Sequence, residues 1–177
     1  MDKIHLHLDN STIVWQCDSG NTGEGIDYSD LCLQHDVIMI GPGNGGQYPG
    51  CLTSPVFEAA CRENGERVDS ARRYVRRIAE EMADGEIVVL KRGLSVVRGV
   101  GVVVGDYLYY PNFRDIRGWN VCHCRRVRWF WEEGHIFNSH PLAQNRLSKL
   151  WVEEVRNWLR TISYRESDMT RPLRPLP

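Results

Sequence analysis

The stretch Asn120-Val-Cys-His-Cys-Arg-Arg-Val-Arg-Trp-Phe-Trp131 decides how this chain is interpreted. It combines guanidinium groups, large flat rings and one histidine in a segment with the composition of a β-strand. Arginine binds phosphates and stacks on bases, and aromatic rings also stack on bases. An ordinary core strand does not need this combination, so the segment predicts a strand that contributes to nucleic-acid binding.

A strand over this stretch divides its side chains between two faces. Successive side chains point in opposite directions, so Cys122 and Cys124 share one face, and His123 shares the other with Arg125. Thiolate and imidazole are standard zinc ligands, yet the alternation separates them and no second Cys or His pair lies nearby. We therefore expect the two thiols and Trp129 to be buried, and we predict no metal and no cofactor.

Composition limits the class of protein. The 177 residues are 42% hydrophobic and 25% charged, which is typical of one globular domain rather than of a disordered or membrane protein. The formal net charge of −1 excludes nucleic-acid binding through overall positive charge, so any such binding must be local. The first residues lack the pattern of a secretory signal, so we expect a cytoplasmic protein whose six cysteines are reduced.

The remaining segments predict an α+β fold. A helix is expected after an N-cap at Asp69 or Ser70 and before Gly85, with apolar residues at helical spacing and arginines on a solvated face. A second helix is expected after an N-cap at Ser148. Short apolar runs bounded by turn residues predict strands at residues 11–17, 36–40, 86–91, 96–104 and 106–110.

Two glycines suggest how this sheet is shaped. Gly99 and Gly101 lie on one face of a predicted strand, where missing side chains let the sheet coil tightly or another backbone approach. We expect a small mixed β-barrel of about six strands flanked by helices, as a single domain over residues 1–165. Residues 166–177 are proline-rich and are predicted to form an extended C-terminal tail or linker that leads out of the domain.

Aromatic residues near predicted strand ends suggest a pocket. Trp15, Tyr109 and Trp119 are placed where two rings can hold one extruded base, and stacking is worth ~1–3 kcal/mol per base. The long loop after residue 40 begins with Gly41-Pro-Gly-Asn-Gly-Gly46, which fits the letters G-x-G-x-x-G. Because no helix follows directly, we reject a dinucleotide site. Either Asn44 and nearby backbone N–H groups donate to a phosphate or base edge, or the loop is a plain turn.

Taken together, four segments resemble a known family, the EVE-like branch of the PUA-like superfamily, which also contains YTH and ASCH domains. The segments are Asp84-Gly-Glu-Ile-Val-Val-Leu-Lys-Arg-Gly93, Val97-Arg-Gly-Val-Gly-Val-Val103, Asp106-Tyr107 and Gly118-Trp-Asn-Val-Cys-His-Cys-Arg-Arg-Val-Arg-Trp129. The chain is similar to the EVE-like domains at the N-terminus of McrB-type GTPases in modification-dependent restriction systems. The resemblance implies a small barrel whose pocket receives a flipped, modified base. Duplex DNA with a modified base is then the expected partner, and restriction-complex subunits are further candidate partners.

The resemblance also implies site residues. The pocket is expected where the first strand ends, at the glycine-rich loop, and around the start of the last strand. The base-pocket candidates are Trp15, Cys17, Gly41, Asn44, Tyr109, Trp119, Asn120 and His123. The phosphate-binding candidates are Arg92, Arg117, Arg125 and Arg126.

The function expected from these observations is binding rather than catalysis. No spacing signals a nucleophile with its base or a pair of catalytic carboxylates. We predict a non-catalytic reader of a modified base in DNA, the specificity module of a restriction system. Two alternatives stay open: an RNA-modification reader or RNA-binding protein of the same fold, and an enzyme that processes nucleotides or nucleic acid. The base also stays open, because 6-methyladenine calls for an aromatic cage and a modified cytosine for a donor and acceptor set.

Overall fold

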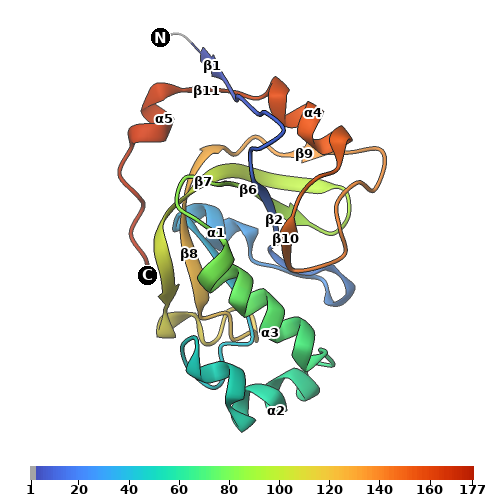
Figure 1. Ribbon diagram of the computed structural model, residues 1–177, viewed down its shortest axis with the longest axis vertical. Helices are drawn as coiled ribbons and strands as arrows, with labels where there is room; N and C mark the ends of the chain where they lie inside the picture. Colours follow the sequence, from blue (N-terminus) through green and yellow to red (C-terminus); the bar gives the residue numbers. More distant parts are fainter. Residues whose placement is uncertain (1–2) are drawn as a thin grey trace.

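The structure, a computed structural model, describes residues 3–177 and is built on a mixed seven-stranded sheet (Figure 1). The strands pair in the order β10-β2-β6-β7-β8-β5, and β9 adds to β7. β2 and β6 are parallel, and the other pairs are antiparallel. The strands of this sheet are β2 (Val14–Asp18), β5 (Val37–Ile40), β6 (Ile87–Arg92), β7 (Val96–Tyr109), β8 (His123–Trp131), β9 (His135–Ile136) and β10 (Leu147–Lys149).

Helices lie at both ends of the molecule (Figure 1). α2 (Pro55–Glu63) and α3 (Val68–Arg76) lie at one end, and a π-helical turn, Arg77–Glu81, extends α3. α4 (Glu153–Thr161) lies at the other end, beside the small sheet of β1 (Lys3–His5) and β11 (Ser163–Arg165). The remaining elements are α1 (Ser29–Gln34), α5 (Glu166–Thr170), the hairpin β3 (Gly20–Asn21) and β4 (Ile26–Asp27), and the short 3-10 turns Thr22–Glu24, Gly50–Thr53 and Pro111–Phe113. Within residues 3–177, no helix is long and apolar enough to cross a membrane.

The α+β class is confirmed, but the sheet is not a closed barrel. Its pairing path ends at β10 on one side and at β5 on the other, and these two strands do not pair within residues 3–177. The close approach expected at the two glycines is confirmed. A Cβ on Gly101 would lie 2.6 Å from the carbonyl oxygen of Arg128, and one on Gly99 would lie 2.8 Å from Cδ2 of Leu33. The sheet thus coils tightly without closing.

Residues 96–109 form one long strand, where the sequence predicted two. Gly105 has φ +76°, and the register between β7 and β8 shifts between Val104 and Tyr107. The residues expected to make a turn therefore form a β-bulge, which bends a strand without ending it. Figure 1 shows β7 curving along the whole sheet.

The prediction of a helix N-cap at Ser148 is wrong. Ser148 belongs to β10, where it pairs with Gln16 and its hydroxyl accepts a 3.0 Å hydrogen bond from the Gln16 amide. Helix α4 begins five residues later, after Val152. The helix expected from Asp69 or Ser70 is confirmed as α3, although it begins at Val68 after Arg67.

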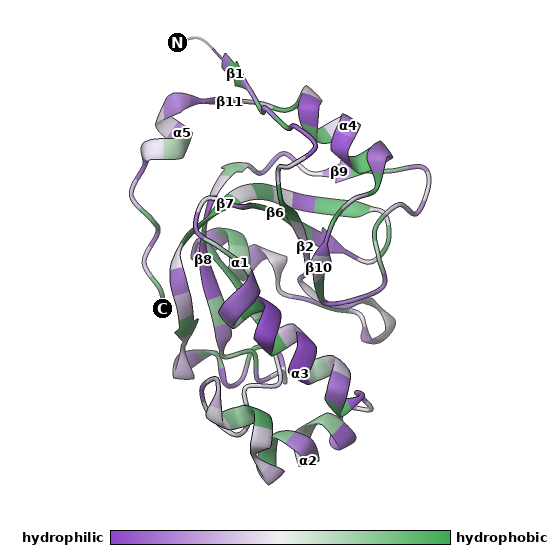
Figure 2. Ribbon diagram, in the orientation of Figure 1, coloured by the Kyte–Doolittle hydropathy of each residue, from purple (hydrophilic) through white to green (hydrophobic). Residues whose placement is uncertain are grey.

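The sheet has a hydrophobic cluster on each face, because side chains alternate along each strand. On β2, Trp15 belongs to the cluster that contains Cys122, Cys124 and Trp129, and its neighbour Val14 belongs to the cluster packed against α4. The predicted burial of both thiols and of Trp129 is confirmed. Figure 2 shows hydrophobic residues along the central strands and hydrophilic residues along the outer side of α3.

The proline-rich segment lies against the domain. Of residues 166–177, which were predicted to be extended, 166–170 form α5 instead and 171–177 are extended. The extended residues follow β8 instead of leading away from it (Figure 1). The fully buried carboxylate of Asp36 accepts two hydrogen bonds from the Arg171 guanidinium, at 2.6 and 2.7 Å, and one from the backbone N–H of Arg174 at 2.6 Å. Nε of Arg128 donates to the Arg171 carbonyl at 2.9 Å. Asp36, directly before β5, therefore holds the tail in place.

Candidate functional site

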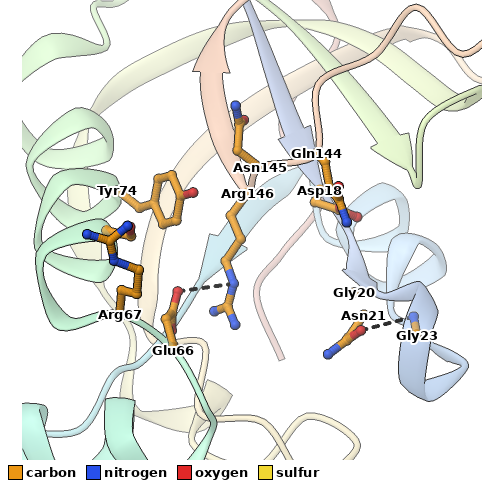
Figure 3. Close-up of a pocket in the computed structure, with 11 residues that line it drawn as sticks. Asp18, Gly20, Asn21, Gly23, Glu66, Arg67, Tyr74, Gln144, Asn145 and Arg146 are labelled. Atoms are coloured by element: carbon orange, nitrogen blue, oxygen red, sulfur yellow. Dashed lines mark hydrogen bonds and ion pairs between the residues drawn. The ribbon is translucent and has the colours of Figure 1, made fainter.

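A polar pocket of about 370 Å³ lies between α3, the end of β2 and the segment before β10 (Figure 3). Arg146 stands at its centre, with Tyr74 on one side and Asp18 on the other. Glu66 approaches Arg146 from below in this view. The other residues that line the pocket include Gly20, Asn21, Gln144 and Asn145.

Local chain geometry explains why these residues meet. Asp18 is the last residue of β2, and its backbone N–H donates to the carbonyl of Arg146 at 2.8 Å because β10 pairs with β2. Glu66 lies in the turn between α2 and α3, where Gly65 adopts φ +66°, a left-handed conformation that glycine accepts at little cost. Tyr74 projects from the middle of α3. Three segments far apart in sequence therefore converge on one pocket.

Arg146 links this pocket to two residues that the sequence predicted for base binding. Its guanidinium carbon lies 5.2 Å from the centroid of the Trp119 ring, within the range of a cation–π contact. Its Nη1 lies 3.4 Å from the carbonyl oxygen of Gly41. Its Nε lies 3.5 Å from Oε1 of Glu66. Trp119 and Gly41 therefore contact Arg146, which lines the pocket, but they do not line the pocket themselves.

Three side-chain oxygens of the pocket residues are buried without a donor from residues 3–177. They are Oδ1 of Asp18, Oε2 of Glu66 and Oδ1 of Asn145. Buried polar atoms in folded proteins almost always have a partner, so three exceptions around one pocket call for an explanation. None of the three atoms is exposed, so a ligand in the pocket does not reach them without a movement of the side chains.

Both carboxylates of the pocket have a cationic neighbour. Oδ2 of Asp18 accepts a 2.9 Å hydrogen bond from Nζ of Lys91, whose side chain has no exposed surface. Burial raises the pKa of Asp18, and Lys91 opposes that shift. Burial likewise raises the pKa of Glu66, and Arg146 opposes it. Each acid is thus held beside one positive charge while one of its oxygens stays without a donor.

Two base-pocket candidates on β2 lie in the core. The Trp15 ring has no exposed surface, and its Nε1–H donates to Oε2 of Glu86 at 2.7 Å. Cys17 is also fully buried, and burial raises its pKa to about 12. Neither side chain offers a surface to a ligand in this conformation. The neighbouring Asp18 reaches the pocket instead, since the side chain one residue further along the strand points the other way.

The glycine-rich loop packs against the segment before β8. The N–H of Gly43 donates to the carbonyl of Asn120 at 2.9 Å, and the Tyr109 hydroxyl donates to the carbonyl of Gly43 at 2.7 Å. A side chain on Gly41 would collide with the Asn120 carbonyl. Asn44 is half-buried beside this contact. The structure therefore brings four base-pocket candidates close together in tightly packed segments: Gly41, Asn44, Tyr109 and Asn120.

His123 belongs to a chain of internal hydrogen bonds. Its Nε2 lies 3.0 Å from the Pro42 carbonyl, which can only accept, so Nε2 carries the proton. Burial lowers the pKa of His123 to about 4, so the ring is neutral and Nδ1 accepts the 2.7 Å bond from the Tyr107 hydroxyl. The Tyr107 oxygen in turn accepts from the N–H of Tyr48 at 3.1 Å. Every polar atom of this imidazole is satisfied inside the protein, which assigns it a structural role.

The four phosphate-binding candidates are bonded to protein acceptors. Arg125 is only 4% exposed and donates to the carbonyl of Gly105 at 2.6 Å, and burial lowers its pKa. Nε of Arg126 donates to the Asp36 carbonyl at 3.1 Å, and the docked tail covers this side chain through the Arg174 carbonyl. Arg92 pairs with Asp27 at 3.3 Å, and Arg117 forms two bonds to Asp30, at 2.9 and 2.7 Å. Of the four, Arg92 and Arg117 keep substantial exposure.

Helix α3 supplies exposed arginines beside the pocket. Arg73 and Arg76 are exposed and, unlike Arg72, have no ion pair within residues 3–177. They line a second hollow, of about 540 Å³, on the side of α3 away from Tyr74. The sequence assigned these arginines to a solvated face, and the structure adds that the same helix forms a wall of the polar pocket.

Sequence reasoning missed the residues that make this pocket. Asp18 carried a usable signal, because it is an acid directly after the first core strand and before a glycine-rich turn. Glu66, Asn145 and Arg146 lie in irregular segments with no pattern of their own. Only the packing of β10 on β2 brings Arg146 to the site.

Fold and pocket together define an α+β domain with a polar pocket at one side of a mixed sheet. The chain belongs to the family described as Domain of unknown function (DUF8426), whose model matches residues 15–153. The matched region contains every residue that lines the pocket. No curated protein and no solved structure matches the chain.

Proposed function

We propose that this protein is a non-catalytic reader of a modified base in DNA, and that the polar pocket around Arg146 receives the extruded base. The observation that carries the proposal is the arrangement of that pocket, in which the Arg146 guanidinium stands between the Tyr74 ring and Asp18. Extruding a base costs a few kcal/mol, which the pocket must offset by hydrogen bonds and stacking. Base edges carry acceptors that a guanidinium can serve and N–H groups that a carboxylate can accept.

The size and walls of the pocket support this assignment. Its volume of about 370 Å³ falls within the ~300–1,000 Å³ typical of ligand pockets. Tyr74 supplies one ring for stacking, and Arg146 supplies guanidinium donors for acceptor atoms of the base.

Binding is favoured over catalysis by the state of the two acids. Lys91 and Arg146 lie beside the carboxylates of Asp18 and Glu66 respectively, and each cation opposes the rise in pKa that burial causes. Carboxylates held in ion pairs are suited to accepting hydrogen bonds rather than to moving protons during a reaction. The neutral His123 is bonded within the protein and does not line the pocket.

The proposal includes the relationship that the sequence suggests. We assign the coiled mixed sheet to the EVE-like branch of the PUA-like superfamily, as an open form of that β-barrel. We also infer that the domain acts as the specificity module of a modification-dependent restriction system. The order of elements supports this: a first core strand, a glycine-rich loop after β5, and the arginine-rich and tryptophan-rich β8.

The test is a binding panel at fixed salt. Short duplexes of one sequence carry either an unmodified base or one of several modified bases, and single-stranded RNA is the additional arm. We expect tighter binding to at least one modified duplex, and we expect Arg146→Met to remove that preference. Arg160→Gln, on α4 at the far end of the molecule, is the control and should leave the preference unchanged. Equal affinity for every duplex would contradict the proposal, and tighter binding to RNA would favour an RNA reader.

A further inference from the structure

We propose that the surface formed by Asp36, Glu132, Arg126 and Arg128 is a binding site for arginine-containing peptide segments in the polyproline II conformation. The tail, residues 171–177, is its intramolecular ligand and lies along β8 (Figure 1). None of the residues that hold the tail lines the polar pocket around Arg146. The peptide site is therefore separate from the proposed base pocket and adds a second function to the domain.

The sequence of the tail restricts its backbone to the polyproline II conformation. In Arg171-Pro-Leu-Arg-Pro-Leu-Pro177, every residue except Leu173 is a proline or directly precedes one. Proline fixes φ at about −65°, and the residue before a proline avoids the helical region. Arg171 has φ −59° and ψ 147°, which are values of this conformation. Because the free segment already favours the bound conformation, it loses little entropy when it docks.

The tail presents three edges, because polyproline II has three residues per turn. The arginine edge and the leucine edge are half-buried, and the proline edge is exposed. These edges consist of Arg171 with Arg174, Leu173 with Leu176, and Pro172 with Pro175, respectively. Leu176 packs against the hydrophobic cluster that contains Trp129. The arginine and leucine edges therefore face the domain, while the prolines set the conformation of the segment.

Asp36 recognises the arginine edge. Its carboxylate is fully buried, and every donor to it within residues 3–177 comes from the tail: two from the Arg171 guanidinium and one from the Arg174 backbone. The Arg174 guanidinium lies 3.8 Å from Oδ1 of Asp36 and donates to Oε1 of Glu132 at 2.9 Å. A buried carboxylate needs a partner. Because the tail supplies all of its donors, this site is built for an arginine ligand.

The domain also binds the backbone of the tail at every third residue. Three tail carbonyls accept hydrogen bonds from side chains that lie along and beside β8. The donors are Nε of Arg128 to the carbonyl of Arg171, at 2.9 Å, Nη2 of Arg126 to that of Arg174, and Nδ2 of Asn112 to that of Pro177, at 3.0 Å. Successive carbonyls of this set are one turn apart, about 9 Å in polyproline II. The row of donors therefore matches the repeat of the ligand.

The contacts of the tail are mostly polar, which suits a ligand that exchanges. The side chains of Arg171 and Arg174 keep 23% and 38% of their surface exposed. Within residues 3–177, Leu176 is the one tail side chain that packs against a hydrophobic cluster. Interfaces that open in solution are more polar than permanent ones. A partner segment with two arginines three residues apart in a proline-rich stretch can therefore replace the tail.

The test is the binding of a labelled peptide, Arg-Pro-Leu-Arg-Pro-Leu-Pro, to the full chain. The site is vacated by Arg171→Glu with Arg174→Glu, which place two acids beside Asp36. We expect at least about tenfold tighter binding to this double variant than to the parent, where the tethered tail competes at a millimolar effective concentration. The peptide should also raise the Tm of the double variant. Asp36→Asn added to it should remove peptide binding, whereas Asp106→Asn, at an exposed position of β7, should not.

A second peptide and a second variant test the pattern. The same seven residues with the two arginines adjacent should bind about tenfold more weakly, because adjacent residues lie on different edges. Pro172→Gly with Pro175→Gly loosens the tail without removing an arginine, and this variant should also bind the first peptide more tightly than the parent does. Thermal unfolding shows which variants are folded. Equal binding of the two peptides, or no binding to a folded variant of either kind, would overturn the proposal and make the tail a fixed part of the fold.

Discussion

Asp36→Asn should loosen the tail and destabilise the domain. The carboxylate is fully buried and accepts three hydrogen bonds from the tail, two from the Arg171 guanidinium and one from the Arg174 backbone. The residue has φ +48°, a left-handed conformation that asparagine also tolerates, so the substitution removes charge with little backbone strain. The test therefore isolates the electrostatic contribution.

The expected loss of stability follows from how deeply each partner of the Asp36–Arg171 ion pair is buried. Breaking a fully buried ion pair costs ~3–5 kcal/mol. The Arg171 side chain is 23% exposed, so water compensates part of its loss, and we expect ~2–3 kcal/mol. A chain of this size changes its Tm by ~2–4 °C per kcal/mol. The expected fall in Tm is therefore ~4–12 °C.

The assay is thermal and urea unfolding of four proteins: the parent, Asp36→Asn, Arg171→Met and the double variant. We expect the single effects not to add, with a coupling free energy of ~1–2 kcal/mol. Limited proteolysis should also release residues 171–177 faster from Asp36→Asn than from the parent. A coupling free energy below ~0.5 kcal/mol, with an unchanged Tm, would refute the assignment of Asp36 as the anchor of the tail.

Three further outcomes can be measured with simple variants. Arg73→Gln with Arg76→Gln should weaken binding to all duplexes nearly uniformly and reduce the salt slope by ~1 per arginine, whereas Arg160→Gln should not. The pKa of His123 is lowered from 6.5 to about 4, so the unfolded state binds more protons between these values. His123 should therefore stabilise the fold above pH 6.5 and lose this contribution as the pH falls towards 4, by up to ~3 kcal/mol, relative to a His123→Gln variant measured in parallel. Gly101→Ala should lower the urea midpoint, because its Cβ would lie 2.6 Å from a backbone oxygen of β8.

Local patterns were sufficient to predict most elements of the fold. The strands around residues 14–18, 37–40, 87–92 and 123–131 and the helix α3 follow from apolar periodicity. The errors occurred where tertiary pairing overrode a local signal. Ser148 has the composition of an N-cap, but pairing with β2 places it in a strand, and Gly105 forms a bulge because β8 continues alongside it.

The candidate site was harder to predict than the fold, because its residues are defined by packing. Arg146 and Glu66 lie in irregular segments, and they meet only because β10 pairs with β2 and because α3 packs nearby. Trp119 and Gly41 were predicted for the pocket and do border it through Arg146. Two predicted residues therefore lie next to the pocket, while the residues that line it are defined by packing in three dimensions.

The arginines show why composition alone cannot locate a phosphate-binding surface. On β8, Arg125 lies beside the carbonyl of Gly105 and Arg126 beside that of Asp36, so each guanidinium is bonded inside the protein. On α3, Arg73 and Arg76 are exposed and line the second hollow, and neither forms an ion pair within residues 3–177. A guanidinium that is already bonded to buried carbonyls must break those bonds before it can bind a phosphate, whereas an exposed one exchanges only water. Phosphate contacts are therefore expected on α3, the helix that also carries Tyr74 into the pocket.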